Sequence, residues 1–379
     1  MWVRVLFGFK QELELGLLNL PTPVVISYWW GLGVSLGFVY VLQVLSGLLL
    51  SAFYAVGGVD GGFSAVVIIM MDVKWGWLLR MLHCGGVSLY FMLLYGHMLR
   101  GLLYGSFGYR SVWGWGLLVY VFSIIVAFLG YVLPWGSMSY WGMVVVTSVV
   151  GVLPGVGGSL MELIWGSVSM PGVFSLSRFF SLHYILSLGV GLLALLHMLE
   201  LHSVGSSNPL GVSVSVMEGV PFHDAFSYKD GLVLVWVLGL YWYLVLVNPH
   251  IVMDAVNYEE INNMSTPTHI KPEWYFLYLY CILRSVPSKG GGVVLMCFAV
   301  VVIWMFAFFI LHRGGTVSLL SFKVGLMLFT LSFGILTALG GKAVEFPYYE
   351  LSGLFVLVYY ISILVMWCSL VCDVQKVSC

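Results

Sequence analysis

The chain has 379 residues, of which 61% are hydrophobic and 8% are charged, and its formal net charge is −1. A soluble domain carries about 25% charged residues, so this composition excludes a soluble globular protein and predicts a membrane protein with many spans. No basic cluster points to a nucleic-acid partner. The six cysteines include no C-x-x-C pair, which excludes a thiolate zinc site and the covalent attachment of a c-type haem.

Eight apolar segments are long enough to cross a bilayer. A span requires about 20 mostly apolar residues, and backbone groups in lipid must hydrogen-bond within their own segment, which favours helices. We therefore expect an all-α polytopic membrane protein. The expected spans are residues 30–53, 75–104, 111–133, 174–202, 229–248, 290–311, 320–340 and 350–370. Two connections, 134–173 and 249–289, are too long to be simple turns, and such connections often carry function.

Two pairs of histidines have the same spacing in the second and fourth spans. His83 and His97 are fourteen residues apart, and so are His183 and His197. Fourteen positions are almost four helical turns, so both members of a pair face the same way, about 21 Å apart, inside a hydrocarbon core about 30 Å thick. Because alternate spans run in the same direction, the two pairs face each other at two depths. A single membrane histidine is more often a packing residue or a proton relay, but this repetition predicts two six-coordinate haems.

Glycines repeat the same spacing in the first and third spans. The glycine pairs are Gly33 with Gly47 and Gly116 with Gly130. Glycine has no Cβ and lets a flat group approach the backbone. We expect the first glycine of each pair at the depth of His97 and the second at the depth of His83. Any one of these glycines also fits an ordinary role in helix packing.

Arginines lie close to these histidines in the sequence. Arg80 and Arg178 precede the first histidine of each pair, and Arg100 follows His97 by three residues. The guanidinium group matches the geometry of a carboxylate. We therefore expect these arginines to pair with haem propionates.

Four motifs carry a resemblance to a known family. They are G-Y-V-L-P-W-G at 130–136, R-F-F at 178–180, G-S-S-N-P at 205–209 and P-E-W-Y at 272–275. Together with the histidine pairs, they make the chain resemble cytochrome b of the quinol–cytochrome c reductase, respiratory complex III. The resemblance extends from about residue 29 to residue 348, nearly the whole chain.

The resemblance implies two non-covalent b-type haems. The low-potential haem would lie between His83 and His183 near the positive side of the membrane, and the high-potential haem between His97 and His197 near the negative side. It also implies an N-terminal di-haem four-helix bundle with the long 134–173 loop and a C-terminal four-helix domain with the 272–275 motif. We place these two domains at residues 1–210 and 211–379.

The resemblance also implies a quinol site on the positive side. Glu273 would accept a proton there, since it follows a proline and lies among aromatic residues, where desolvation raises the pKa of a carboxyl group. On the residues alone, a carboxylate that stabilises a helix N-terminus, with Pro272 in the first turn, explains Glu273 equally well. The other expected residues of this site are Tyr280 as a catalytic residue and Gly142, Pro272 and Tyr275 as binding residues.

A quinone site is implied on the negative side. Its expected residues are His202 and Asp230 as catalytic residues and Ser206 and Lys229 as binding residues. The histidine, serine and aspartate can hydrogen-bond two quinone carbonyls and deliver protons. Where members of the family often have asparagine and serine on the first span, this chain has Gly31 and Val34.

The implied function is oxidation of ubiquinol on the positive side, with one electron crossing through the two haems to reduce ubiquinone on the negative side, which contributes to proton translocation. The implied partners are a Rieske-type iron–sulfur subunit, a c-type cytochrome subunit, other complex III subunits, membrane lipids and a second copy of the complex. The implied location is the mitochondrial inner membrane, with the bacterial plasma membrane as the alternative. The N-terminal segment fits neither a signal peptide nor a transit peptide, so we expect the mature protein to begin at Met1.

Three other classes of protein could carry some of these features. A split, plastid-type cytochrome b has fifteen residues within its second pair, whereas both pairs here are fourteen apart in one continuous chain. A two-haem anchor subunit of a dehydrogenase usually has fewer helices and lacks the 272–275 motif. A transporter or channel would use its intramembrane ionisable groups as a substrate path and would bind no haem.

Overall fold

The computed structural model describes residues 20–57, 61–210, 219–262, 265–308 and 320–377. Within these ranges eight helices are long and apolar enough to cross a membrane, which confirms the expected all-α polytopic fold. The spanning helices are α2 (Leu32–Ser51), α4 (Gly76–Leu103), α5 (Arg110–Val132), α8 (Val173–Val204), α9 (Phe222–Trp242, continued by a π-helical turn Tyr243–Val247), α11 (Lys289–Val301, continued by a 3-10 helix Val302–Phe308), α12 (Leu320–Gly340) and α13 (Tyr348–Val377). Met1 and the expected end of the sixth span, 309–311, lie outside the described residues.

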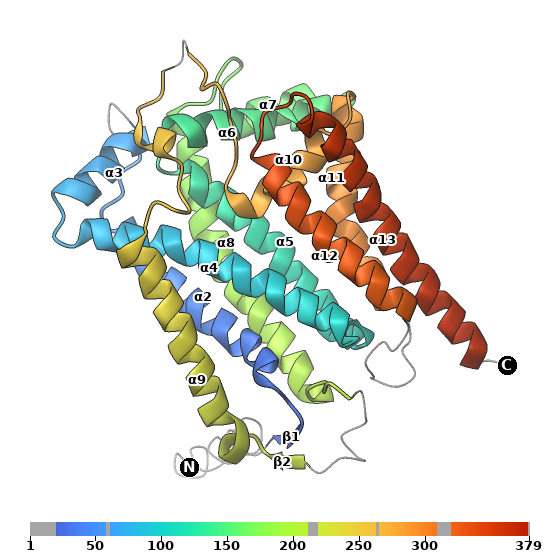
Figure 1. Cartoon of the computed structure of the whole chain (residues 1–379). Coiled ribbons are helices and arrows are strands. Elements are labelled where there is room, and N and C mark those ends of the chain that lie inside the picture. The colour runs from blue at the N-terminus through green and yellow to red at the C-terminus, as the bar shows by residue number, and fades with distance from the viewer. Residues whose placement is uncertain (1–19, 58–60, 211–218, 263–264, 309–319, 378–379) are drawn as a thin grey trace.

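The four helices that carry the histidine and glycine pairs form one bundle. Helix α2 packs against α4, and α5 packs against α8. Helix α9 joins this bundle through α2 and α4, on the side away from α11, α12 and α13 (Figure 1). The division of the chain into domains 1–210 and 211–379 stays a prediction, and in the structure α9, which begins the second range, packs against helices of the first.

Helix α4 also connects the bundle to the second half of the chain. The largest buried apolar cluster contains side chains of α4 and α5 together with side chains of α10 to α13. Among its fully buried members are Tyr120, Tyr278, Phe306, Phe322 and Tyr359. The helix with the first histidine pair is therefore held from both sides, which restricts how far its side chains can shift.

Short helices gather at one end of the molecule (Figure 1). The 134–173 connection contains α6 (Ser137–Ser148) and α7 (Gly157–Trp165), and α3 (Gly61–Met71) precedes α4. The 249–289 connection contains the 3-10 turns Ala255–Tyr258 and Trp274–Phe276, followed by α10 (Leu277–Arg284). At about 1.5 Å per residue, these helices are too short to span a bilayer, so they are expected to lie along its surface. This end is called the α6 end below.

The opposite end holds the strands that the structure describes. Strand β1 (Pro21–Pro23) pairs antiparallel with β2 (Gly219–Pro221), with Pro21 opposite Pro221. Proline lacks an N–H and cannot continue a helix, so both segments are extended where they meet. This strand pair joins the segment before α2 to the segment before α9. It is a local departure from the expected all-helical fold.

Candidate functional site

The four paired histidines face each other across the bundle as two couples. The ring centroids of His83 and His183 are 6.2 Å apart with an interplanar angle of 84°, and those of His97 and His197 are 6.2 Å apart at 77°. A bond from a metal to an imidazole nitrogen is about 2 Å long and the ring centre lies about 1 Å behind that nitrogen, so two rings on opposite sides of one metal have centroids about 6 Å apart. Each couple therefore leaves room for one metal atom.

The two histidines of α8 present a free nitrogen to their partners. Nδ1 of His183 lies 2.8 Å from the carbonyl oxygen of Val126, and Nδ1 of His197 lies 2.8 Å from that of Val112. A carbonyl only accepts hydrogen bonds, so Nδ1 carries the proton and Nε2 keeps its lone pair. This is the arrangement that orients an imidazole for a metal.

The two histidines of α4 differ from each other. Nδ1 of His83 lies 3.0 Å from Oγ of Ser46, whose hydroxyl donates to the carbonyl of Leu42 at 2.7 Å, so Nδ1 donates to Ser46. Nδ1 of His97 instead lies 3.2 Å from Nη2 of Arg100. A guanidinium only donates, so this contact places the ring proton of His97 on Nε2. Binding of a metal at Nε2 therefore requires Arg100 to turn away from the ring.

Each glycine of the two spaced pairs lies against one histidine, at the depth expected. A Cβ added to the glycine would lie 2.5 Å from Cε1 of His183 for Gly130, 3.0 Å from Cε1 of His83 for Gly47, 3.1 Å from Cε1 of His197 for Gly116 and 3.5 Å from Cε1 of His97 for Gly33. A contact below 3.0 Å forces the neighbour to move. The absence of a side chain leaves room for the rings at Gly130, Gly47 and Gly116, whereas a Cβ at Gly33 would make only ordinary contact.

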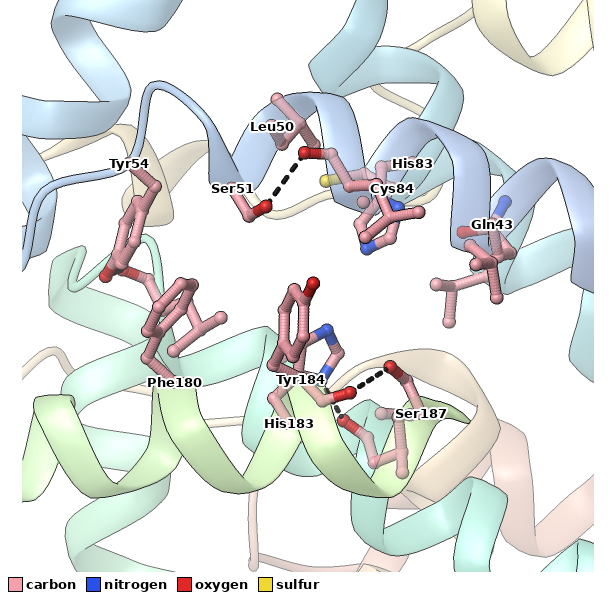
Figure 2. Close-up of a pocket in the computed structure, with 18 of the residues that line it drawn as sticks. Gln43, Leu50, Ser51, Tyr54, His83, Cys84, Phe180, His183, Tyr184 and Ser187 are labelled. Carbon is pink, nitrogen blue, oxygen red and sulfur yellow. Dashed lines mark hydrogen bonds between the residues drawn. The ribbon is translucent and has the colours of Figure 1, made fainter. Parts of the chain in front are cut away.

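A cavity of about 200 Å³ opens between the first histidine couple. Figure 2 shows His83 and His183 entering it from opposite helices. Its lining is mostly apolar and includes Gly47, Gly130 and the buried Arg80. Nε of Arg80 is buried without a hydrogen-bond partner among the described residues, which is costly for a charged group. A carboxylate in this cavity would satisfy it.

The other two arginines are placed differently. Nε of Arg100 is also buried without a partner among the residues that the structure describes, and its guanidinium lies 5.2 Å from the ring centre of Trp30. Arg178 is exposed and donates from Nη1 to the carbonyl oxygen of Leu163. Arg178 does not line the cavity at His183. Its role beside a propionate stays a prediction, and its present partner is a backbone carbonyl.

Glu273 is half-buried at the α6 end. Burial raises the pKa of its carboxyl group to about 8, with nearby Asp254 adding to the rise and Lys271 opposing it. Glu273 precedes the 3-10 turn Trp274–Phe276, but its side chain makes no capping hydrogen bond to that turn. A capping hydrogen bond therefore does not account for this carboxylate, and its role as a proton acceptor stays a prediction.

The residues expected around Glu273 are held by contacts between distant segments. The ring of Tyr275 stacks on Phe91 of α4, with centroids 4.3 Å apart. Tyr280 donates its hydroxyl to the carbonyl of Ile270 at 3.0 Å. A Cβ on Gly142 of α6 would lie 3.9 Å from the ring of Tyr131, which is ordinary contact. The structure thus brings the 272–280 segment against α4 and leaves Gly142 on the neighbouring α6.

The residues expected at the second quinone site share the opposite end of the molecule. They are His202 at the end of α8, Ser206 just after it, and Lys229 and Asp230 in the third turn of α9. Among the described residues no hydrogen bond or ion pair joins these four, and Nζ of Lys229 lies 4.9 Å from the ring centre of Phe226. A Cβ on Gly31 would lie 3.0 Å from Val233 of α9, so α9 fills the space that a larger side chain would need.

Some contacts of the site were not anticipated from the sequence. The backbone carbonyls of Val112 and Val126 that hold two histidines carry no side-chain signature. Ser46 precedes Gly47 and was a visible but unused signal. The ion pair between Lys271 and Asp254, with Nζ and Oδ2 2.9 Å apart, joins two residues of the 249–289 connection that no motif links.

Comparison with known proteins agrees with this arrangement. Residues 17–205 match the family model for cytochrome b/b6/petB, and residues 260–361 match the model for the C-terminal part of cytochrome b/b6/petD. A curated cytochrome b from Leptorhynchoides thecatus is 49% identical over 360 residues, which cover 94% of this chain and 96% of that protein. The chain belongs to the cytochrome b family.

Other relatives extend the agreement. The cytochrome b proteins of Albinaria caerulea and Mytilus edulis are each 41% identical, over 93% and 92% of this chain and 96% and 87% of their own lengths. A solved structure described as a hyperthermophilic respiratory complex III superposes with a TM-score of 0.90 at 25% identity, covering 97% of this chain and 98% of its own. The expected membership is confirmed: the chain is a cytochrome b of complex III.

This membership establishes the coarse function. Cytochrome b is the core redox subunit of complex III, so the chain takes part in electron transport between quinol and quinone, binds haem and associates with other complex III subunits. With eight apolar helices of spanning length in the part of the chain that the structure describes, it is a multi-pass membrane protein. A transporter or a dehydrogenase anchor is thereby set aside.

Proposed function

We propose that the chain oxidises ubiquinol at the α6 end and passes electrons through two b-type haems to reduce ubiquinone at the opposite end, contributing to proton translocation. In this proposal the α6 end faces the positive side of the membrane. The observation that carries the proposal is the pair of imidazole couples, each with ring centroids 6.2 Å apart.

The donor set of each couple fits a haem. Within the described residues no group of three or more His, Cys, Asp and Glu side chains could hold a metal ion. Two opposed imidazoles supply only two ligands, so a metal held between them would take its other ligands from a macrocycle. His83 and His183 would hold the low-potential haem, and His97 and His197 the high-potential one. When bound, the haems supply one-electron carriers at two depths of the membrane.

The residues around each haem then have definite roles. Gly47, Gly116 and Gly130 leave three of the histidine rings room beside α2 and α5. Arg80 and Arg100, each with a buried unpaired Nε, would bind propionates. Movement of Arg100 toward a propionate would free Nδ1 of His97. Apolar walls exclude water from the cavity between His83 and His183, which together with the axial ligands sets the haem potential.

Glu273 is the proposed proton acceptor for the quinol. A carboxyl group with a pKa of about 8 is close to the operating pH, where a general base is most effective. Burial alone would raise the pKa of Asp254, but its hydrogen bonds from Lys271 and the N–H of Val256 lower it below the usual value. Asp254 therefore stays ionised and acts on Glu273 as a fixed charge. Tyr280, Pro272, Tyr275 and Gly142 would complete the quinol pocket.

The quinone would bind at the opposite end. His202 and Asp230 are proposed to hydrogen-bond its carbonyls and deliver protons, with Ser206 and Lys229 as further contacts. Gly31 and Val34 offer no polar side chain to this site.

The proposed partners are those of complex III. One electron from each quinol must leave toward an acceptor outside this chain, which we assign to a Rieske-type iron–sulfur subunit, followed by a c-type cytochrome subunit. A dimer of the complex in the mitochondrial inner membrane is the proposed setting, and the bacterial plasma membrane is the alternative. The b-type haems and the quinone sites are the parts of this scheme that this chain itself would provide.

A spectrum with a kinetic assay tests the proposal. The purified complex should contain two b-type haems per copy of this chain in a reduced-minus-oxidised spectrum, and ubiquinol should reduce cytochrome c in its presence. One haem or none per chain, or haems that ubiquinol fails to reduce, would contradict it.

Gly130→Ala tests the room left for the first couple. The added Cβ would lie 2.5 Å from Cε1 of His183 and must displace the ring, and overpacking of this kind costs about 1–3 kcal/mol. We expect the haem at His83 and His183 to be lost or weakly held. Gly114→Ala on the same helix, where the nearest atom is 3.8 Å away, is the matched control and should keep both haems. Equal haem content in the two variants would count against the assignment.

A further inference from the structure

The segment from Asp254 to Glu260 lies across the α6 end and contacts both walls of the proposed quinol site. Gly136 forms an isolated antiparallel bridge with Glu260, and the N–H of Ser137 donates to the carbonyl of Glu259 at 2.9 Å. These contacts join the first turn of α6 to a segment more than a hundred residues later in the chain.

Asn257 completes this junction with its side chain. The N–H of Ser139 donates to Oδ1 of Asn257 at 2.8 Å. The N-cap position of α6 is Gly136, which has no side chain to cap the helix. The first N–H groups of a helix have no partner within it, so Asn257 supplies from a distance the capping oxygen that the local sequence lacks.

The fit between the two segments is tight. A Cβ on Gly136 would lie 2.2 Å from the carbonyl oxygen of Asn257 and 2.7 Å from its Oδ1. The preceding residue, Trp135, has a φ of +53°, a left-handed conformation that costs a non-glycine residue about 1–2 kcal/mol. Such strain persists only where the surroundings hold it, and Asn257 lies against the next residue of the same turn.

The same segment is attached to the Glu273 wall. Oδ2 of Asp254 lies 2.9 Å from Nζ of Lys271, and its Oδ1 accepts from the N–H of Val256 at 3.0 Å. The N–H of Lys271 in turn lies 3.5 Å from Sδ of Met138, in the first turn of α6. A closed circuit of contacts therefore runs from α6 through Asn257 and Asp254 to Lys271, two residues before Glu273.

The circuit also contacts the haem cavity. The guanidinium carbon of Arg80 lies 4.9 Å from the ring centre of Tyr258, and Arg80 lines the cavity at His83 and His183. Tyr258 directly follows Asn257 and is part of the same 3-10 turn. The position of this turn is thus linked to α6, to Lys271 and to Arg80, the residue proposed to bind a propionate.

We propose that Asn257 is a positioning residue for quinol oxidation, whose side-chain amide holds the first turn of α6 at a fixed distance from Glu273. The proposal rests on the proposed function for its kinetic consequence. Loss of the amide oxygen frees the N–H of Ser139 and loosens one wall of the pocket. The bound quinol would then be held less well, while the histidine couples, which lie deeper in the bundle, would keep their haems.

The test compares Asn257→Ala, Asn257→Asp and Ser148→Ala in the purified complex. Asn257→Ala should raise the KM for ubiquinol roughly fivefold, the effect of losing one capping hydrogen bond, with an unchanged haem spectrum. Asn257→Asp keeps an oxygen that accepts from Ser139, at a helix N-terminus where a carboxylate is favoured, and should restore the KM. Ser148→Ala, at the exposed end of the same helix, should leave it unchanged.

Hydrogen exchange of the α6 amides gives a second readout. Asn257→Ala should speed exchange in the first turn of α6, and Asn257→Asp should not. A wild-type KM together with wild-type exchange in Asn257→Ala overturns the proposal, as does a loss of assembled complex with an unchanged KM. If the wild-type complex fails to oxidise ubiquinol, the proposed function fails, and exchange alone still decides the capping role.

A second variant tests the proposal if Asn257→Ala prevents the complex from assembling. If Asn257→Ala yields no complex, Asp254→Asn removes the charge that pairs with Lys271 while keeping an oxygen for the N–H of Val256. A rise of roughly twofold to fivefold in the KM for ubiquinol is expected. An unchanged KM in that variant would contradict the proposed positioning role of this circuit of contacts.

Discussion

Replacing His97 with leucine should remove one b-type haem from the complex and leave the other in place. Leucine cannot ligate iron, and the facing His197 would then be the only axial ligand at that depth. The couple of His83 and His183 lies several helical turns away with its own hydrogen bonds, so its haem should persist. The reduced-minus-oxidised spectrum of the purified complex should show half of the b-type haem.

The control for this variant is another histidine. His223 is exposed and its Nδ1 lies 3.0 Å from Oγ of Ser227, so His223→Leu should keep both haems. An unchanged two-haem spectrum in His97→Leu would disprove the role of His97.

Replacing Glu273 with glutamine should slow quinol oxidation by roughly a hundredfold, the usual contribution of a general base. Only the ionised carboxylate can accept a proton. With a pKa of about 8, about a tenth of Glu273 is ionised at pH 7 and about nine tenths at pH 9. The wild-type rate should therefore rise with pH, about tenfold for each pH unit well below 8, and level off above it. The glutamine variant should lack this dependence.

Steady-state turnover per haem between pH 6 and pH 9 measures both effects. Glu162→Gln, an exposed carboxylate on α7, is the matched control and should keep the wild-type rate and pH profile. Normal turnover in Glu273→Gln, or a pH profile that survives the substitution, would remove Glu273 from the path of the proton.

The parts of the fold and site that could be predicted are those encoded by periodicity. Hydrophobic length predicted all eight spans, because a helix in lipid must be both long and apolar. Helical geometry makes a spacing of fourteen residues return a side chain to the same face, so the facing of His83 with His183 could be foreseen. The glycine spacing predicted the depth of Gly130 for the same reason.

The rest depends on contacts that no local pattern records. Backbone carbonyls such as that of Val126 hold the histidine rings, and any residue type offers a carbonyl. Arg178 has the right position along its helix, yet its side chain extends to the carbonyl of Leu163. Asn257 meets Ser139 across 118 positions of sequence. Its capping role follows from tertiary folding, because Gly136 leaves the local cap empty.

An experimental density map of the purified complex tests the central claim most directly. Two porphyrins should lie between α4 and α8, one with its iron between His83 and His183 and the other with its iron between His97 and His197. The side chain of Arg100 should have turned from His97 toward a propionate. A map in which His183 or His197 faces lipid, or in which either couple has no porphyrin between its rings, would contradict the account.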